Sequence, residues 1–201
     1  MTFGLVRAYL VLDSPISNSS VASKYWGIDA AFQYGGANGS DPIGLSNVTA
    51  GFVDTGSTLL YLHSGKLLRD SRYVYADSQR PTTLDAYDQY VEVTGGVFDN
   101  TTQLLRITEA QYESLQSLNI VIGGETFEMT RNAQIWPRAL NTAILGEEDA
   151  IYLIVVDIAQ TYPGLDFVFG MAFLERFYSV FDTGNRRIGL ARTQFTNATT
   201  N

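Results

Sequence analysis

The sequence predicts an all-β domain, mainly antiparallel, with a few short helices. The chain contains 12 tyrosines and 11 phenylalanines, which favour strands, and 18 glycines, which favour tight turns between strands. Several stretches alternate apolar and polar residues, which is the period of two that a half-buried strand requires. No repeat or linker divides the 201 residues, so a single domain over 1–201 is expected.

The first 62 residues predict strands joined by turns. Residues 3–12 are apolar and β-prone. The next strand is expected to carry its apolar side chains on one face, at Trp26, Ile28, Ala30, Phe32 and Tyr34. A turn-rich loop follows at 34–44. Residues 49–62 predict a strand, a tight turn at Thr55-Gly56 and a second strand.

A helix is expected over residues 82–93. Thr82 and Asp85 have the spacing of a capping box, and Gly95-Gly96 provides a stop signal. The apolar face of this helix would carry Leu84, Tyr87 and Val91.

A shorter helix and a hairpin are expected next. Thr108 and Gln111 repeat the capping pattern and predict a helix that carries Leu115 and Leu118. The following apolar residues alternate on both sides of Gly123-Gly124, which predicts a tight hairpin at that pair.

The last third of the chain predicts strands again. Residues 150–159 are apolar enough for a strand that is covered on both faces. A strand at 167–169, one or two helical turns over 170–177 and a hairpin through 182–185 complete the domain.

Charge and composition exclude several classes of function. The formal net charge is −8 and the pI about 4.5, which argues against nucleic acid or an anionic membrane as the main partner. No stretch approaches the roughly 18 apolar residues of a membrane span. The chain has no cysteine, and His63, the single histidine, is interpreted as a loop residue. The acids at 147–149 are interpreted as solvated and Trp136 as a core residue, so no metal or other cofactor is expected.

Five Asn-x-Ser/Thr sequons are candidate glycosylation sites: Asn18, Asn38, Asn47, Asn100 and Asn197. They predict an extracellular protein. The first residues lack the basic and small-residue features of a signal peptide, so any targeting segment is expected to lie outside this chain.

The triplet Asp-Thr-Gly occurs twice, in different surroundings. Asp54 lies between two segments predicted as buried strands, where a carboxylate needs hydrogen bonds because an unpaired buried charge is costly. Hydroxyls for that purpose follow at Thr55, Ser57 and Thr58. The triplet alone leaves two alternatives open, an acid held for proton transfer and an ordinary β-turn. Asp182 precedes Gly184-Asn185 and two arginines, which predicts a solvated hairpin turn without a catalytic role.

Four stretches together resemble the C-terminal lobe of the pepsin-type aspartic proteases. They are YWGI at 25–28, GFVDTGSTL at 51–59, TFEMTRNAQIWPRALNTAI at 126–144 and GLDFVFGMAFLERFYSVFDTGNRRIGLA at 164–191. The last contains the apolar-apolar-Gly segment of the family, here Val168, Phe169 and Gly170, and its final turn with a non-catalytic Asp. The resemblance implies one lobe of the bilobal, pepsin-like fold.

The resemblance also implies a role for the residues around the first triplet. Asp54 would be one of two catalytic aspartates. Catalytic support would come from the rest of the turn, Thr55, Gly56 and Ser57, with the Ser57 hydroxyl on the outer carboxylate oxygen. Substrate contacts would come from Phe52, which lines a side-chain pocket, and Thr58, which reaches the substrate backbone. Gly170 would let its strand pass close beneath the catalytic loop.

The chemistry of this family needs two carboxyls. A pair about 3 Å apart cannot both ionise, so the two groups share one proton. The ionised group takes a proton from a water while the protonated group polarises the peptide carbonyl. This chain has one catalytic triplet and about half the length of the family, so the N-terminal lobe is expected to be absent. Residues 1–23 fit the family pattern poorly, and 65–80 are expected to be a mobile loop insertion.

Three hypotheses about function follow. The first is an aspartic endopeptidase lobe that cleaves polypeptides together with a complementary N-terminal-type lobe. In the second, two copies of the chain each supply Asp54, as in retroviral proteases. The third is a truncated or non-catalytic lobe that binds peptides. Cleavage preference cannot be predicted from the sequence.

Overall fold

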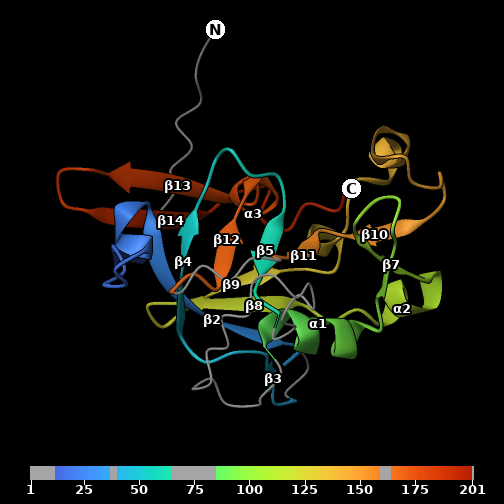
Figure 1. Cartoon of the computed structure of the whole chain (residues 1–201), viewed down its shortest axis with the longest axis horizontal. Coiled ribbons are helices and arrows are strands. Elements are labelled where there is room, and N and C mark those ends of the chain that lie inside the picture. Colours follow the sequence, from blue (N-terminus) through green and yellow to red (C-terminus); the bar gives the residue numbers. More distant parts are fainter. Residues whose placement is uncertain (1–11, 37–39, 65–84, 159–163, 201) are drawn as a thin grey trace, which may run out of the picture.

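The computed structural model of the chain describes residues 12–36, 40–64, 85–158 and 164–200 (Figure 1). Its centre is an eight-stranded sheet with the order β11-β5-β12-β4-β2-β8-β9, in which β3 also pairs with β2. The strands are β2 (Gly27–Tyr34), β3 (Ile43–Gly44), β4 (Thr49–Val53), β5 (Leu60–Leu62), β8 (Leu118–Ile122), β9 (Glu125–Met129), β11 (Val155–Asp157) and β12 (Phe167–Phe169). Two pairs, β11–β5 and β12–β4, are parallel and the other described pairs are antiparallel. The predicted fold class is confirmed.

Two smaller antiparallel sheets accompany the central one and lie at opposite ends of the view in Figure 1. One has the order β1-β14-β13 and consists of Leu12–Pro15, Arg187–Arg192 and Phe177–Asp182. The other has the order β10-β7-β6 and consists of Ile151–Leu153, Leu105–Ile107 and Val97–Phe98. The strand predicted at 3–12 lies almost entirely outside the described residues, as does the insertion predicted at 65–80.

The strands that the sequence pattern predicted with a clear period are confirmed. In β2 the side chains of Ile28, Ala30, Phe32 and Tyr34 are buried, and Trp26 just before it is half-buried. The β8–β9 hairpin turns at Gly123-Gly124, where both glycines have positive φ angles of 56° and 90°. A side chain would strain this turn, because L-residues rarely adopt that region.

The first helix, α1 (Ala86–Thr94), begins later than predicted. Asp85 is its N-cap and has an extended backbone, and its side chain makes no capping hydrogen bond. The Asp85 carboxylate instead contacts the Nδ1 atom of His63 at 2.8 Å. The predicted helix over 82–93 is therefore wrong at Asp85, while Thr82 and Leu84 lie outside the described residues. The helix ends at Gly95, as predicted, with a φ angle of 65°.

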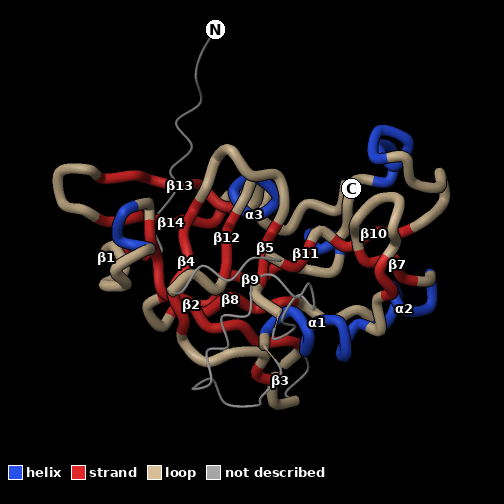
Figure 2. Tube along the Cα trace, viewed as in Figure 1, coloured by secondary structure: helices blue, strands red, loops and turns tan. Residues whose placement is uncertain are grey.

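The second helix, α2 (Glu109–Ser114), has the predicted capping box between Thr108 and Gln111. It is shorter than expected, because Leu115 is already extended and Leu118 is the first residue of β8. The third helix, α3 (Met171–Leu174), is the short helix predicted after residue 170. Figure 2 shows how few helical segments accompany the strands. Short 3₁₀ turns also occur, at Ala22–Lys24, Asn132–Gln134 and Arg138–Ile144.

The buried stretch predicted as one strand at 150–159 is two strands. β10 pairs with β7, whereas β11 pairs with β5 in the central sheet. Ile154 lies between them and is buried. Its amide donates to the Gln134 carbonyl (2.9 Å) and not to β7 or β5, the strands that pair with β10 and β11. The chain changes sheets here without becoming exposed, so the apolar run gives no sign of the break.

Aromatic side chains form the centre of the core. Phe32 contacts Phe167 and Phe169 edge to face, and Phe169, Phe173 and Phe177 continue the series at centroid distances of 4.5 and 4.8 Å. All five side chains are at most 1% exposed. This series extends from the central sheet through α3 to β13, so it fixes the position of β12 in the middle of the fold.

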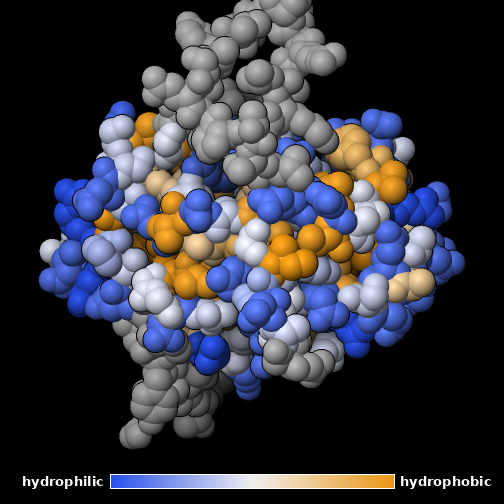
Figure 3. Space-filling model, turned by 90° about the horizontal axis from the view of Figure 1, so that it is seen from below, coloured by the Kyte–Doolittle hydropathy of each residue, from blue (hydrophilic) through white to orange (hydrophobic). Residues whose placement is uncertain are grey.

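The surface carries mixed polar and apolar groups. Figure 3 shows one face on which hydrophobic groups are separated by hydrophilic ones.

The acids at 147–149 are exposed, and Glu147 forms a two-point ion pair with Arg106 at 2.7 and 2.5 Å. Trp136 packs partly buried against the core, in agreement with its interpretation as a core residue. No helix in the described part of the chain is long and apolar enough to cross a membrane.

Candidate active site

Asp54 follows β4 directly and is held by the turn that the sequence predicted. The amide of Gly56 donates to its Oδ1 atom (2.9 Å), and the Ser57 hydroxyl donates to Oδ2 (2.6 Å). Both carboxylate oxygens are thus engaged by neutral donors from the next three residues. Asp54 itself is half-buried. The Thr55 and Thr58 side chains are exposed beside it.

Strand β12 supports this turn from beneath. β4 and β5 are consecutive in the chain, yet β12 lies between them and pairs with both, so that Val168 is opposite Phe52 and Phe169 opposite Val53. The amide of Asp54 donates to the Phe169 carbonyl at 2.9 Å. This bond fixes the backbone of the carboxyl-bearing residue to the buried centre of the sheet.

Gly170 makes the close approach possible. Its amide donates to the Leu59 carbonyl (3.1 Å), and the next amide, of Met171, donates to the Ser57 carbonyl (2.8 Å). A Cβ atom at Gly170 would lie 2.6 Å from the Ser57 carbonyl oxygen and closer still to that of Leu59. Both obstacles are backbone atoms, so no side-chain movement can relieve the overlap. The structure thus has Val168, Phe169 and Gly170 directly beneath the turn that holds Asp54.

A pocket of about 500 Å³ opens beside Asp54. Phe52 forms part of its wall and stacks on Tyr25 with a centroid distance of 5.0 Å and an interplanar angle of 25°. Arg186 and Lys24 also line it. Sequence reasoning assigned no role to Tyr25, Lys24 or Arg186, because nothing in their local sequence indicates that they meet at one site.

The second triplet forms a different kind of turn, at the end of the β13–β14 hairpin. Asp182 accepts from the Asn185 amide (3.0 Å), the Asn185 Nδ2 atom (2.7 Å) and the Arg187 Nε atom (2.9 Å). These side-chain bonds to Asn185 and Arg187 lower the pKa of Asp182 to about 2. The carboxyl is tied into its own hairpin, as predicted for a structural turn.

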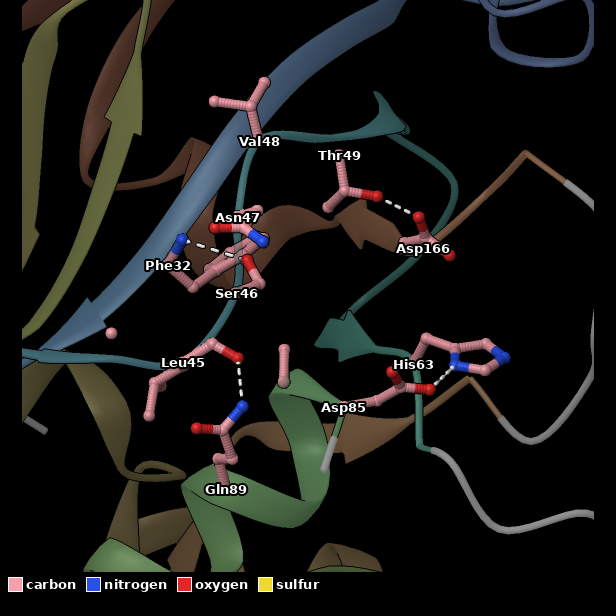
Figure 4. Close-up of a pocket in the computed structure, with 12 residues that line it drawn as sticks. Phe32, Leu45, Ser46, Asn47, Val48, Thr49, His63, Asp85, Gln89 and Asp166 are labelled. Atoms are coloured by element: carbon pink, nitrogen blue, oxygen red, sulfur yellow. Dashed lines mark hydrogen bonds and ion pairs between the residues drawn. The ribbon is translucent and has the colours of Figure 1, made fainter. Parts of the chain in front are cut away.

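A second pocket, of about 540 Å³, lies on another part of the molecule and contains other polar groups (Figure 4). Its hydrogen bonds join Thr49 to Asp166, Gln89 to the Leu45 carbonyl and His63 to Asp85. His63 lies outside the strands, as expected for a loop residue, but only 8% of it is exposed. The sequence does not indicate that His63 is buried, because its contact Asp85 is 22 positions away in the chain.

Comparison with known proteins identifies the family. The model of the eukaryotic aspartyl protease family matches residues 11–193. The chain belongs to this family. Polyporopepsin of Irpex lacteus is 49% identical over 189 residues, which are 94% of this chain and 48% of that protein. The crystal structure of the aspartic proteinase from Irpex lacteus superposes with a TM-score of 0.80 at 47% identity, covering 97% of this chain and 51% of the other.

These comparisons confirm the predicted family and the pepsin-like fold. The chain spans about half the length of the two aspartic protease relatives, which agrees with the prediction of a single lobe. Within that lobe, the structure brings together the predicted site residues: Phe52, Asp54, Thr55, Gly56, Ser57, Thr58, Val168, Phe169 and Gly170.

Proposed function

We propose that this chain is an aspartic endopeptidase lobe that supplies Asp54 as one of two catalytic carboxyls. The main support is the pair of neutral hydrogen bonds to Asp54, from Gly56 and Ser57. Asp54 forms no ion pair with any residue in the described part of the chain. Acid–base catalysis requires a carboxyl held in a fixed orientation, and these two donors hold Asp54 in that way.

The second carboxyl would come from a complementary lobe or from a second copy of the chain. With the two groups about 3 Å apart, one proton is shared between them. The ionised carboxylate removes a proton from a water as the water oxygen bonds to the peptide carbonyl carbon. The protonated carboxyl hydrogen-bonds the carbonyl oxygen, which becomes negative as the new bond forms.

The residues around Asp54 would have distinct parts in this reaction. Ser57 and Gly56 orient the carboxyl, and Thr55, which is exposed, would hydrogen-bond across the interface between lobes. Thr58, also exposed, would reach the backbone of the polypeptide substrate. Phe52 would line a pocket for a substrate side chain. Gly170 keeps β12 close beneath the turn, so it acts through the position of Asp54.

We place the protein outside the cell on the basis of its sequons. Four of the five candidate asparagines are exposed: Asn18, Asn47, Asn100 and Asn197. Exposure at the surface is what attachment of a glycan to these side chains requires. The fifth, Asn38, lies outside the described residues.

The proposed function is tested by digestion of haemoglobin at acidic pH, with light-scattering mass measured on the same samples. We expect the monomeric chain to be inactive, because half of a carboxyl pair has no partner to share its proton. Activity should appear when an N-terminal-type lobe of a family member is added. If the chain alone is active and its rate rises with the square of its concentration, two copies form the site.

Two results would contradict the proposal. A monomer that cleaves in proportion to its concentration, and does so in the Asp54→Asn variant, has its catalytic groups elsewhere. A chain that binds peptides but stays inactive with every complementary lobe would be the non-catalytic lobe of the third hypothesis.

A further inference from the structure

We propose that the pocket beside Asp54 accepts an acidic side chain of the peptide substrate, and that Lys24 and Arg186 select it. This inference rests on the proposed function and adds a substrate class to it. It is carried by two positive side chains that line the same pocket from distant parts of the chain and form no ion pair with any described residue.

The two cations approach the pocket from separate elements. Lys24 is the last residue of the 3₁₀ turn Ala22–Lys24, just before β2. Arg186 is the last residue of the turn between β13 and β14. Both line the pocket together with Asp54, so a group bound there shares its walls with these cations and the proposed catalytic carboxyl.

Neither cation is paired with an acid in the part of the chain that the structure describes. Lys24 and Arg186 are exposed, and no residue in the described ranges forms an ion pair with either of them. The adjacent Arg187 differs, because it pairs with both Asp13 and Asp182. In a chain with a net charge of −8, two unpaired cations at one pocket make a local positive region that favours an anionic ligand.

The backbone of Arg186 is held in an unusual conformation. Its φ angle is +53°, in the left-handed region that non-glycine residues seldom adopt. Its carbonyl accepts a hydrogen bond from the Ile16 amide (3.1 Å), which anchors the residue to the segment after β1. Such a conformation persists only where the surroundings fix it, so the start of the Arg186 side chain has a defined direction.

The rest of the wall suits the apolar part of an acidic side chain. Phe52 and Tyr25 stack and present aromatic surface, and Trp26 also lines the pocket. A glutamate would place its methylene groups against these rings and its carboxylate near the two cations. A glutamine has the same shape and gains only the apolar contact, so the pocket should discriminate by charge.

The test is calorimetric binding of two decapeptides that differ in one central residue, Glu or Gln, to the full chain. We expect the Glu peptide to bind about five-fold more tightly at low salt, because each exposed ion pair contributes little and two act together. Raising the salt concentration should reduce this preference. The double variant Lys24→Gln/Arg186→Gln should lose it, and Lys24→Arg/Arg186→Lys should keep it.

Two further variants separate the possible causes. Arg192→Gln makes the same charge change at an exposed arginine outside the pocket, so the preference for Glu should remain. Asp54→Asn removes the negative charge beside the ligand, so the Glu peptide should bind at least as tightly as to the unmodified chain. This binding readout does not need catalysis, so it is independent of whether Asp54 proves to be catalytic.

The proposal is overturned if the unmodified chain binds the Glu and Gln peptides equally, or binds neither. It is also overturned if the Lys24→Gln/Arg186→Gln chain retains the preference while circular dichroism shows that it is folded. Loss of the preference in Arg192→Gln would assign the effect to overall charge and would contradict a local pocket.

Discussion

The two Asp-Thr-Gly turns of this molecule begin with the same residues and hold their carboxyls in different ways. Asp54 receives hydrogen bonds from Gly56 and Ser57, which are neutral, and its own amide is fixed by the buried strand β12. Asp182 is bonded by Asn185 and by the guanidinium of Arg187. The difference lies in the residues after the triplet and in what supports the turn from beneath.

This contrast has a chemical consequence. The pKa of the Asp182 carboxyl is lowered to about 2 because Asn185 and Arg187 bond to its ionised form, so protonation would cost this hairpin those bonds. No described residue places a cation on the Asp54 carboxyl. A three-residue motif therefore does not identify a catalytic acid unless the charge of its hydrogen-bond partners is known as well.

The largest expected difference between the two turns is in catalysis. In the enzyme assembled with a complementary lobe, Asp54→Asn should reduce acid proteolysis by about 10²- to 10⁴-fold, which is the usual contribution of a general acid or base. Asp182→Asn should leave the rate within a few-fold, because its carboxyl holds only a hairpin. The measurement is kcat/KM on one peptide substrate, and equal losses in the two variants would refute the distinction.

A second comparison concerns two glycines. Gly170→Ala places a methyl group against the Ser57 and Leu59 carbonyls, which are backbone atoms and cannot turn aside. We expect a loss of about 3 kcal/mol in unfolding free energy, the upper part of the usual range for overpacking, and loss of activity. Gly184→Ala, in the Asp182 turn, meets only the Asp182 Oδ1 atom at 3.4 Å and should change stability by about 0.5 kcal/mol or less.

Urea denaturation of both alanine variants provides the measurement. Neither glycine has a positive φ angle, so the two substitutions differ mainly in the space around the new methyl group. A Gly170→Ala chain as stable as the Gly184→Ala chain would show that β12 can move away from the turn.

Local patterns in the sequence predicted most strands. They also predicted the part of the site that is contiguous in the chain, the turn from Asp54 to Ser57. The period of two from Trp26 to Tyr34, and the hydroxyl of Ser57 three residues after Asp54, are short-range features that depend little on the rest of the fold. The structure confirms both. Gly170 is different, because its place beneath the turn was implied only by resemblance to a family.

The failed predictions involve contacts between distant residues. At the start of helix α1, Asp85 is extended, and its carboxylate contacts His63, 22 positions away, and does not cap the helix. The run at 150–159 divides at Ile154 because the chain moves between sheets while buried on both sides, so hydrophobic periodicity does not change. No role was predicted for Lys24 and Arg186, because the Ala22–Lys24 turn and the β13–β14 hairpin that bring them to one pocket are far apart in the sequence.

Removing one hydrogen-bond donor from each turn should separate stability from activity. Ser57→Ala and Asn185→Ala each leave a carboxylate with fewer donors, and each should cost about 1 kcal/mol of unfolding free energy. Only Ser57→Ala should also lower kcat, by about ten-fold, because Asp54 loses the bond that orients its outer oxygen. Similar loss of kcat in Asn185→Ala would mean that the Asp182 turn takes part in catalysis.

The smallest expected effect is the pH dependence of stability that Asp182 contributes. Its pKa is about 2 in the folded chain and 3.8 in its ordinary state, because Asn185 and Arg187 bond to the ionised form. A lowered folded pKa stabilises the protein above the ordinary pKa, and the contribution disappears as the pH falls from about 4 through about 2. The melting temperature of the unmodified chain should therefore exceed that of Asp182→Asn above pH 4, and the two should converge as the pH approaches 2.

Asp41→Asn, at an exposed acid, controls for the loss of one negative charge. A difference between the unmodified and Asp182→Asn chains that stays constant from pH 6 to pH 2 would show that the hairpin does not depend on an ionised Asp182, and the electrostatic contrast between the two turns would fail.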